Sequence, residues 1–196
     1  MLIGISSIKP QVGKTEAALF LKKNMGFIHV EMSDSISIIA EKFFGYNGNK
    51  SDNKQRKILQ DIGYLGKQID PTIWIYHSLN IALRKKRGLP ENMIVPSFLF
   101  YYNMNYTKKE ICKNGFDNFF GTPCNVVLGG VRSEAEANEI VKLGGRVLLI
   151  NRDGNDNTSS NHIVESELMH YEFNDIIYNN GSLDDFYEKI KIFYKK

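Results

Sequence analysis

The opening of the chain constrains its fold most, because a short apolar run leads through a loop directly into a helix-forming stretch. Residues 2–7 (LIGISS) are apolar and end in small side chains, which predicts a buried strand. Residues 14–24 (KTEAALFLKKN) place apolar side chains on one face of a helix, and Gly26 suits the end of that helix. Apolar strands that alternate with helices are typical of a parallel sheet covered by helices.

The same alternation continues along the chain. Further strands are expected over residues 27–31, 125–131, 146–152 and 174–178. Further helices are expected over roughly 35–44, 54–68, 71–87, 106–114, 133–145 and 162–171, and after Ser182. Residues 93–102 fit either an edge strand or a surface insertion. The sequence therefore predicts a single domain over residues 1–196 with a three-layer α/β/α fold and a mainly parallel sheet.

The loop between the first strand and the first helix ends in Gly13, Lys14 and Thr15, as a phosphate-binding P-loop does. Such a loop surrounds a triphosphate with backbone N–H groups at the positive end of the helix that follows. Gly13 allows a close approach, Lys14 reaches the β- and γ-phosphates, and the Thr15 hydroxyl coordinates Mg²⁺ that arrives with ATP. We therefore predict a P-loop nucleoside triphosphate hydrolase-like fold that binds ATP and Mg²⁺ through Val12, Gly13, Lys14, Thr15 and Glu16.

Three later segments, taken with this loop, carry a family resemblance. The first is residues 58–63 (ILQDIG), followed by Lys67, Asp70 and Trp74. The second is residues 126–132 (VVLGGVR), followed by Glu134, Glu136 and the glycine pair at 144–145. The third lies within residues 162–183 and consists of His162, Glu165, Ser166, Glu167, residues 175–177 (DII), Asn179, Gly181, Ser182 and Leu183. Their order and spacing resemble the phage-type deoxynucleoside monophosphate kinases, which belong to the adenylate-kinase-like P-loop kinases. The resemblance covers most of the chain apart from 88–123, which look inserted.

The resemblance implies that the protein transfers the γ-phosphate of ATP to a (deoxy)nucleoside monophosphate. Lys14, Arg132 and Arg152 are the implied catalytic residues, because phosphoryl transfer depends on positioning and charge neutralisation. Arg132 lies just past a strand end, where open α/β sheets bind ligands. Arg152 begins a polar stretch over 152–162 that is expected to act as a lid. The implied substrate-binding residues are Asp34, Gln60, Lys67, Trp74 and Arg132.

Several positions depart from the family pattern and keep alternatives open. Ile8 stands where the P-loop pattern has its first glycine, Gly130 replaces an acid, and Lys67 replaces an arginine. A different small-molecule kinase that resembles dephospho-coenzyme A kinase, a ligase of the dethiobiotin-synthetase type, and a nucleotide-binding protein with weakened catalysis therefore remain alternatives. The site residues also have structural interpretations. Asp34 fits the N-cap of its helix, Trp74 a core side chain or the wall of a cleft, and Arg132 the cap of a strand end or a partner of Glu134. Arg152 and Gln60 fit surface positions.

Composition limits the partners. The chain has 196 residues, a formal net charge of +3 and two cysteines, which fit no metal or disulfide motif. The N-terminal residues have no signal-peptide pattern, and no apolar run approaches the ~20 residues that span a bilayer. We expect a protein of the cytoplasm, or of the host cytoplasm if it is viral. Its expected partners are nucleotides rather than membranes or nucleic acids, and a homodimer stays open.

Overall fold

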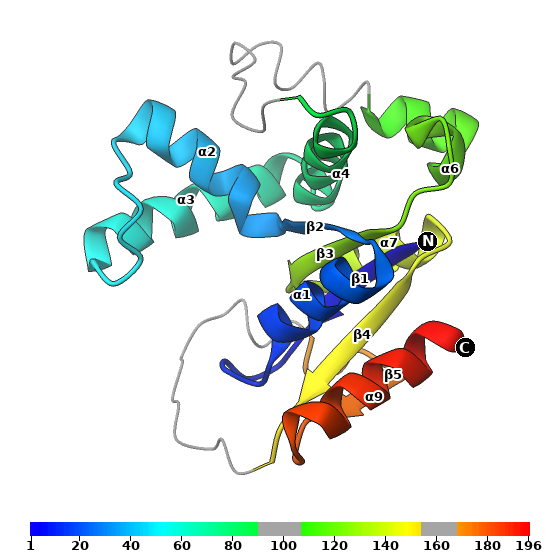
Figure 1. Ribbon diagram of the computed structural model, residues 1–196. Coiled ribbons are helices and arrows are strands. Elements are labelled where there is room, and N and C mark those ends of the chain that lie inside the picture. The colour runs from blue at the N-terminus through cyan, green and yellow to red at the C-terminus, as the bar shows by residue number, and fades with distance from the viewer. Residues whose placement is uncertain (90–106, 154–167) are drawn as a thin grey trace. The chain divides into compact units, whose positions relative to one another are not determined.

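A computed structural model describes residues 1–89, 107–153 and 168–196 of the chain. These residues form two compact units (Figure 1). Unit 1 consists of Met1–His29 and Cys124–Lys196, and unit 2 of Val30–Pro123. The predictions for residues 93–102, for 162–167 of a helix, and for the lid beyond Asp153 lie outside the described residues.

The strands form a parallel sheet whose order is β2-β3-β1-β4-β5. Strand β1 (Leu2–Ser6) pairs in parallel with both β3 (Val126–Val131) and β4 (Arg146–Asn151). Strand β4 also pairs in parallel with β5 (Asp175–Tyr178). The boundary between the units falls within β2 (Ile28–Glu31). The apolar runs read from the sequence are thus strands, each within two residues of its predicted bounds.

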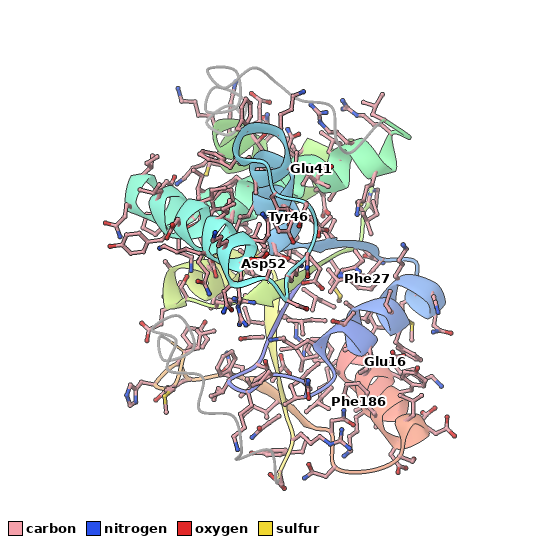
Figure 2. All side chains as sticks on the ribbon, turned by 90° about the vertical axis from the view of Figure 1, so that its left-hand side faces the viewer. Glu16, Phe27, Glu41, Tyr46, Asp52 and Phe186 are labelled. Carbon is pink, nitrogen blue, oxygen red and sulfur yellow. The ribbon has the colours of Figure 1, made fainter. Side chains whose placement is uncertain are left out.

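Helices cover both faces of the sheet in unit 1. Helices α1 (Lys14–Met25) and α9 (Leu183–Lys195) share a buried core with Ile3 and Ile5, and Figure 2 shows Phe186 of α9 beside α1. Residue Gly4 faces the other way, since a Cβ there would lie 2.6 Å from Ile140 Cδ1 of α7 (Glu134–Lys142). Side chains alternate along a strand, so α7 covers the opposite face. The predicted three-layer α/β/α fold with a parallel sheet is confirmed.

Unit 2 is mainly helical. It contains α2 (Met32–Phe44), α3 (Asn53–Ile69) and α4 (Ile73–Lys86), which pack on one another, then helical residues 107–114 and α6 (Phe116–Phe120). The predicted start of the second helix is wrong by three residues. Glu31 is its N-cap, and Asp34 is the third helical residue, whose carboxylate accepts a hydrogen bond from the Glu31 N–H as in a capping box.

Two predictions concern the chain as a whole. Among residues 1–89, 107–153 and 168–196, no helix is long and apolar enough to cross a bilayer. The assignment of residues 1–196 to one P-loop kinase domain, with an insertion at 88–123, stays a prediction.

Candidate functional site: the phosphate loop of unit 1

The loop after β1, residues 7–13, leaves the sheet near its centre, and we call it the phosphate loop. In the strand order, the connection from β1 runs through α1 toward β2, whereas the connection from β3 runs through α7 toward β4. Connections that depart in opposite directions from neighbouring strands open a crevice at the carboxyl ends of those strands. The loops after β1 and β3 therefore flank the position where an α/β sheet of this kind binds ligands.

The backbone of the loop turns sharply just before α1. Gly13 has φ 107° and ψ 15° and is the N-cap of α1, and Gln11 has φ 57°. Both φ values lie in the left-handed region, which residues with a side chain rarely adopt, so a side chain at position 13 would strain the backbone. A Cβ on Gly13 would also lie 2.7 Å from Nδ2 of Asn179. Position 13 thus strongly favours glycine, and the loop leads directly into the N-terminus of α1, the end of a helix that attracts anions.

The side chains of the loop are arranged for a charged ligand. Lys14 Nζ donates to Ser7 Oγ at 2.6 Å, and the Ser7 hydroxyl donates to the Lys9 carbonyl at 2.7 Å. Thr15 is exposed in the first turn of α1, so its hydroxyl is accessible. An ammonium group within the loop, an accessible hydroxyl and a helix N-terminus fit a triphosphate with its Mg²⁺. Ile8 is partly buried.

Glu16, the last residue of the predicted ATP-binding set, is tied to α9. The Tyr187 hydroxyl of α9 donates a hydrogen bond to Glu16 Oε1, and this bond raises the pKa of Tyr187. The Tyr187 ring also stacks on Phe20 of α1, with ring centroids 4.4 Å apart. Glu16, labelled in Figure 2, therefore joins the two helices that lie on this face of the sheet.

Strand β3 ends in a bulge that explains one departure from the family pattern. Ile5 pairs with Gly129 and Ser6 with Val131, so Gly130 is the extra residue. Its φ of 81° is left-handed, as in bulges that glycine allows. The Ser6 hydroxyl donates to the Val131 carbonyl at 2.9 Å, which fixes the strand ends on both sides of the crevice. The left-handed backbone of the bulge thus explains why a glycine occupies position 130.

Arg132 follows this bulge and is exposed. Its backbone N–H and that of Ser133 donate to Glu136 Oε2 at 2.8 and 3.1 Å. The Glu136 side chain is 2% exposed, and it forms a capping box with Ser133 at the start of α7. The turn is therefore fixed by its backbone, while the Arg132 guanidinium remains at the surface beside the crevice.

Arg152 is exposed at the end of β4. Its backbone N–H donates to Asn151 Oδ1 at 2.9 Å, and the next N–H, that of Asp153, donates to Asn180 Oδ1 at 2.9 Å. The carboxyl end of β4 lies on the same edge of the sheet as the phosphate loop, because the strands are parallel. The structure thus places Arg132 and Arg152 after two strands that both neighbour β1.

The remaining predicted substrate-binding residues lie in unit 2. Asp34 is in the α2 capping box, and Gln60 and Lys67 are partly buried on α3. Trp74 of α4 is 3% exposed, and its indole N–H donates to the Gly63 carbonyl at 3.0 Å. Trp74 thus packs α4 on α3.

The sequence did not predict two contacts around the candidate site. The structure joins Asn179, in the turn after β5, to the phosphate loop, because its side-chain amide donates to the Val12 carbonyl at 2.9 Å. It also makes Glu136 the acceptor that orders the turn carrying Arg132. Both residues belong to segments of the family resemblance, but a contact between residues 167 positions apart leaves no local pattern in the sequence.

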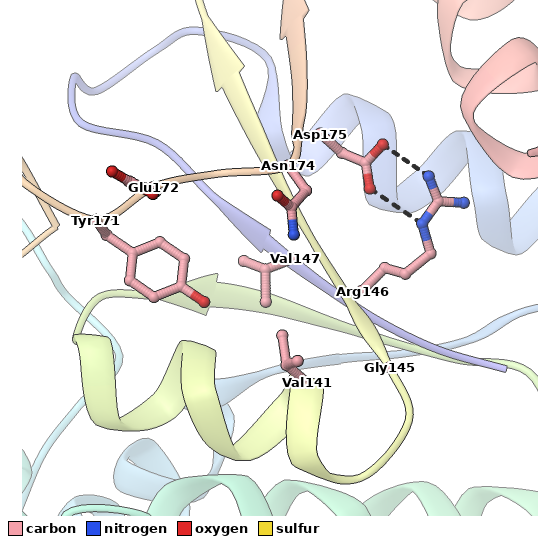
Figure 3. Close-up of a pocket in the computed structure, with 8 residues that line it drawn as sticks. All are labelled: Val141, Gly145, Arg146, Val147, Tyr171, Glu172, Asn174 and Asp175. Carbon is pink, nitrogen blue, oxygen red and sulfur yellow. Dashed lines mark hydrogen bonds and ion pairs between the residues drawn. The ribbon is translucent and has the colours of Figure 1, made fainter.

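A shallow pocket of about 90 Å³ lies at the opposite end of the sheet (Figure 3). Arg146 and Asp175 line this pocket and form an ion pair, in which the guanidinium donates two hydrogen bonds of 3.0 and 2.7 Å to the carboxylate. Arg146 also donates to the Phe193 carbonyl at 2.9 Å and lies over the Phe193 ring. The guanidinium is thus engaged in packing β4, β5 and α9 together, at the amino ends of strands where such sheets do not bind ligands.

A strand, a phosphate loop and a helix at the centre of a three-layer α/β/α unit define a P-loop nucleotide-binding protein. The family model described as deoxynucleotide monophosphate kinase matches residues 89–190, which is more than half of the chain. The chain therefore belongs to the deoxynucleotide monophosphate kinase family, as the resemblance predicted. Membership of this family makes it a phosphotransferase related to nucleotide kinases. The match begins at residue 89 and so includes most of 88–123.

One curated relative agrees with this assignment. A protein of Acanthamoeba polyphaga mimivirus, named "Putative deoxynucleotide monophosphate kinase", is 25% identical over 199 residues, covering 97% of this chain and 94% of that protein. Among solved structures, dephospho-CoA kinase from Campylobacter jejuni is similar at 16% identity and a TM-score of 0.41, over 99% of this chain and 95% of that protein.

Proposed function

We propose that this protein transfers the γ-phosphate of ATP to a deoxynucleoside monophosphate, giving ADP and the deoxynucleoside diphosphate. The observation that carries the proposal is the phosphate loop, with glycine in left-handed backbone and an ammonium group at 2.6 Å from Ser7 Oγ, in a chain of this family. A loop of this geometry suits a triphosphate donor, and the family name supports a deoxynucleotide acceptor.

The chain's own groups would stabilise the transferring phosphoryl group by charge and position. Lys14 would exchange its hydrogen bond to Ser7 for the β- and γ-phosphate oxygens. Arg132 would bind phosphate through its planar guanidinium, whose N–H groups match two oxygens at once. Arg152 would add a second positive charge. Mg²⁺ bound with ATP would neutralise further charge, and the Thr15 hydroxyl is the group suited to hold it.

No side chain is required as a strong base in this reaction. The acceptor is a phosphate monoester whose oxygens are already anionic near neutral pH. We assign the recognition of the acceptor nucleotide to Asp34, Gln60, Lys67 and Trp74, on the basis of the resemblance of these segments to the family. A carboxylate and an amide suit the hydrogen-bonding groups of a base and sugar, and Lys67 suits the acceptor phosphate.

The test is an ADP-release assay against the common deoxynucleoside and nucleoside monophosphates, with dephospho-coenzyme A as a further acceptor. We expect activity on at least one deoxynucleotide, and a fall in kcat/KM of about 10²–10³-fold in Lys14→Ala, since a donor aimed at the transferring group is lost. Lys22→Ala, at an exposed position of the same helix, is the matched control and should retain activity. Turnover that is unchanged in Lys14→Ala, or turnover only with dephospho-coenzyme A, would reject the proposal.

A further inference from the structure

The turn after β5 holds the phosphate loop from the other end of the chain. The Asn179 backbone N–H donates to the Asn151 carbonyl at 2.8 Å, which extends the pairing of β5 with β4. With its backbone fixed in this way, the Asn179 side-chain amide donates to the Val12 carbonyl at 2.9 Å. Val12 is itself 1% exposed within the core under α1 and α9. The loop is thus attached to the sheet at Val12, immediately before the residues that would meet phosphate.

The space beside Gly13 is filled by the same region. A Cβ on Gly13 would lie 2.7 Å from Asn179 Nδ2 and 3.3 Å from Phe186 Cε1. Phe186 is 1% exposed in the core of unit 1. The loop is therefore packed at Gly13 against the Asn179 amide and the Phe186 ring.

The hydrogen bond from Asn179 to the Val12 carbonyl also orients the N–H of Gly13. The carbonyl of Val12 and the N–H of Gly13 belong to one peptide unit, which is planar, and in the trans form they point in opposite directions. Because Asn179 holds the carbonyl toward the turn, the Gly13 N–H is directed away from it. A carbonyl that turned the other way would present its oxygen, rather than the N–H, to an anion.

We propose that Asn179 is a positioning residue for the phosphate loop, which fixes the orientation of the Val12–Gly13 peptide and thereby the affinity of the loop for polyphosphate. The inference rests on the proposed function, because it concerns the same loop. It adds a residue that contacts no phosphate itself and acts through the Val12 carbonyl.

The test measures polyphosphate binding without turnover. The full-length protein is titrated with inorganic tripolyphosphate in magnesium buffer, and then with the accepted deoxynucleoside monophosphate. In Asn179→Ala we expect the Kd for tripolyphosphate to rise about fivefold, as the loss of one partly buried hydrogen bond predicts. In Asn179→Asp, which has the same size but turns an oxygen toward the Val12 carbonyl, we expect a larger rise. The Kd for the monophosphate should stay within twofold in both variants.

The controls separate this role from a merely structural one. Asn138→Ala, at an exposed position of α7 in the same unit, should leave both affinities unchanged. A lower Tm in Asn179→Ala with an unchanged Kd for tripolyphosphate, or an equal loss of both affinities, would overturn the inference while the proposed function stands. A wild-type protein that binds no tripolyphosphate would reject the proposed function, and this inference with it.

Discussion

The two units use their motif residues in different ways. In unit 1, Thr15, Arg132 and Arg152 are exposed, and the structure supports them through the backbone: Asn179 holds Val12, and Glu136 holds the N–H of Arg132. In unit 2 two of the motif residues make contacts within the unit, because the Trp74 indole N–H donates to the Gly63 carbonyl and Asp34 belongs to a capping box. A residue of a family motif can therefore serve either a ligand or the fold, and spacing alone does not distinguish the two.

Asp70 of unit 2 is a further example of this structural use. It accepts hydrogen bonds from the Thr72 N–H at 2.8 Å and from Lys108 Nζ at 2.7 Å, so it joins the start of α4 to the helical residues 107–114. Burial raises the pKa of Asp70, but the hydrogen bonds from Lys108 and Thr72 outweigh it, and the net pKa is lowered. The comparison predicts that substitutions at unit 2 motif residues cost stability, whereas those around the phosphate loop cost ligand affinity.

The largest expected effect in unit 2 is at Gly66, where α3 meets Trp74. A Cβ at Gly66 would lie 2.3 Å from Trp74 Cζ2, and the bulky indole is buried and cannot yield. We expect Gly66→Ala to lower the free energy of unfolding by about 3 kcal/mol, at the upper end for overpacking. Urea denaturation followed by circular dichroism measures it.

Gly63→Ala on the same helix is the matched control. Its Cβ would lie 3.3 Å from Ile36 Cδ1, the end of a flexible side chain. Alanine favours a helix over glycine by about 1 kcal/mol, so this variant should be neutral or more stable. If both variants lost the same stability, the close packing of Trp74 on Gly66 would not be the cause.

The pH dependence of stability tests unit 2 in a second way. His77 of α4 has a buried Nδ1, and burial, aided by the charge of Arg84, lowers the pKa of His77 to about 3. The unfolded chain, with a histidine pKa near 6.5, binds the proton that the folded state refuses. The stabilisation is therefore complete above pH 6.5 and is lost as the pH falls toward 3.

Between pH 6.5 and 5, we expect the free energy of unfolding to decrease by about 1.5 kcal/mol on account of His77. The measurement is a series of urea denaturation curves at pH 5.0, 5.5, 6.0, 6.5 and 7.5. His77→Leu should flatten the curve in this window, because it removes the titrating group. A variant that kept the full wild-type slope would show that other groups cause the acid sensitivity.

The sequence predicted the fold better than the site, and particular residues show why. The strands of unit 1 are continuous apolar runs, and a glycine or a capping serine marks some helix boundaries locally, as at Gly26 and Ser133. The phosphate loop was predictable because its chemistry lies in consecutive residues, 13–15. The supporting contact from Asn179 and the bulge at Gly130 were not, because each depends on strands that meet only in the folded sheet.

The bulge at Gly130 is the next test of the comparison, now in unit 1. Because φ at this position is 81°, alanine should strain the backbone, and we expect Gly130→Ala to lower the free energy of unfolding by about 1 kcal/mol. Gly130→Asn should cost less, since asparagine tolerates left-handed backbone better. Thermal denaturation of both variants measures the difference, and equal losses would argue against strain at this residue.

The smallest expected effect concerns the acceptor side of the proposed reaction, where unit 2 would serve a ligand after all. Lys67 of α3 is partly buried, and its charge should contribute modestly to binding of the acceptor phosphate. We expect Lys67→Ala to raise the KM for the monophosphate about threefold, which is under 1 kcal/mol, with the Kd for ATP unchanged. Lys67→Arg should restore the KM.

Lys54→Ala, at an exposed position near the start of the same helix, controls for the loss of one positive charge. If Lys54→Ala raised the KM equally, the net charge of the helix would explain the effect, and Lys67 would have no specific role in binding the acceptor phosphate.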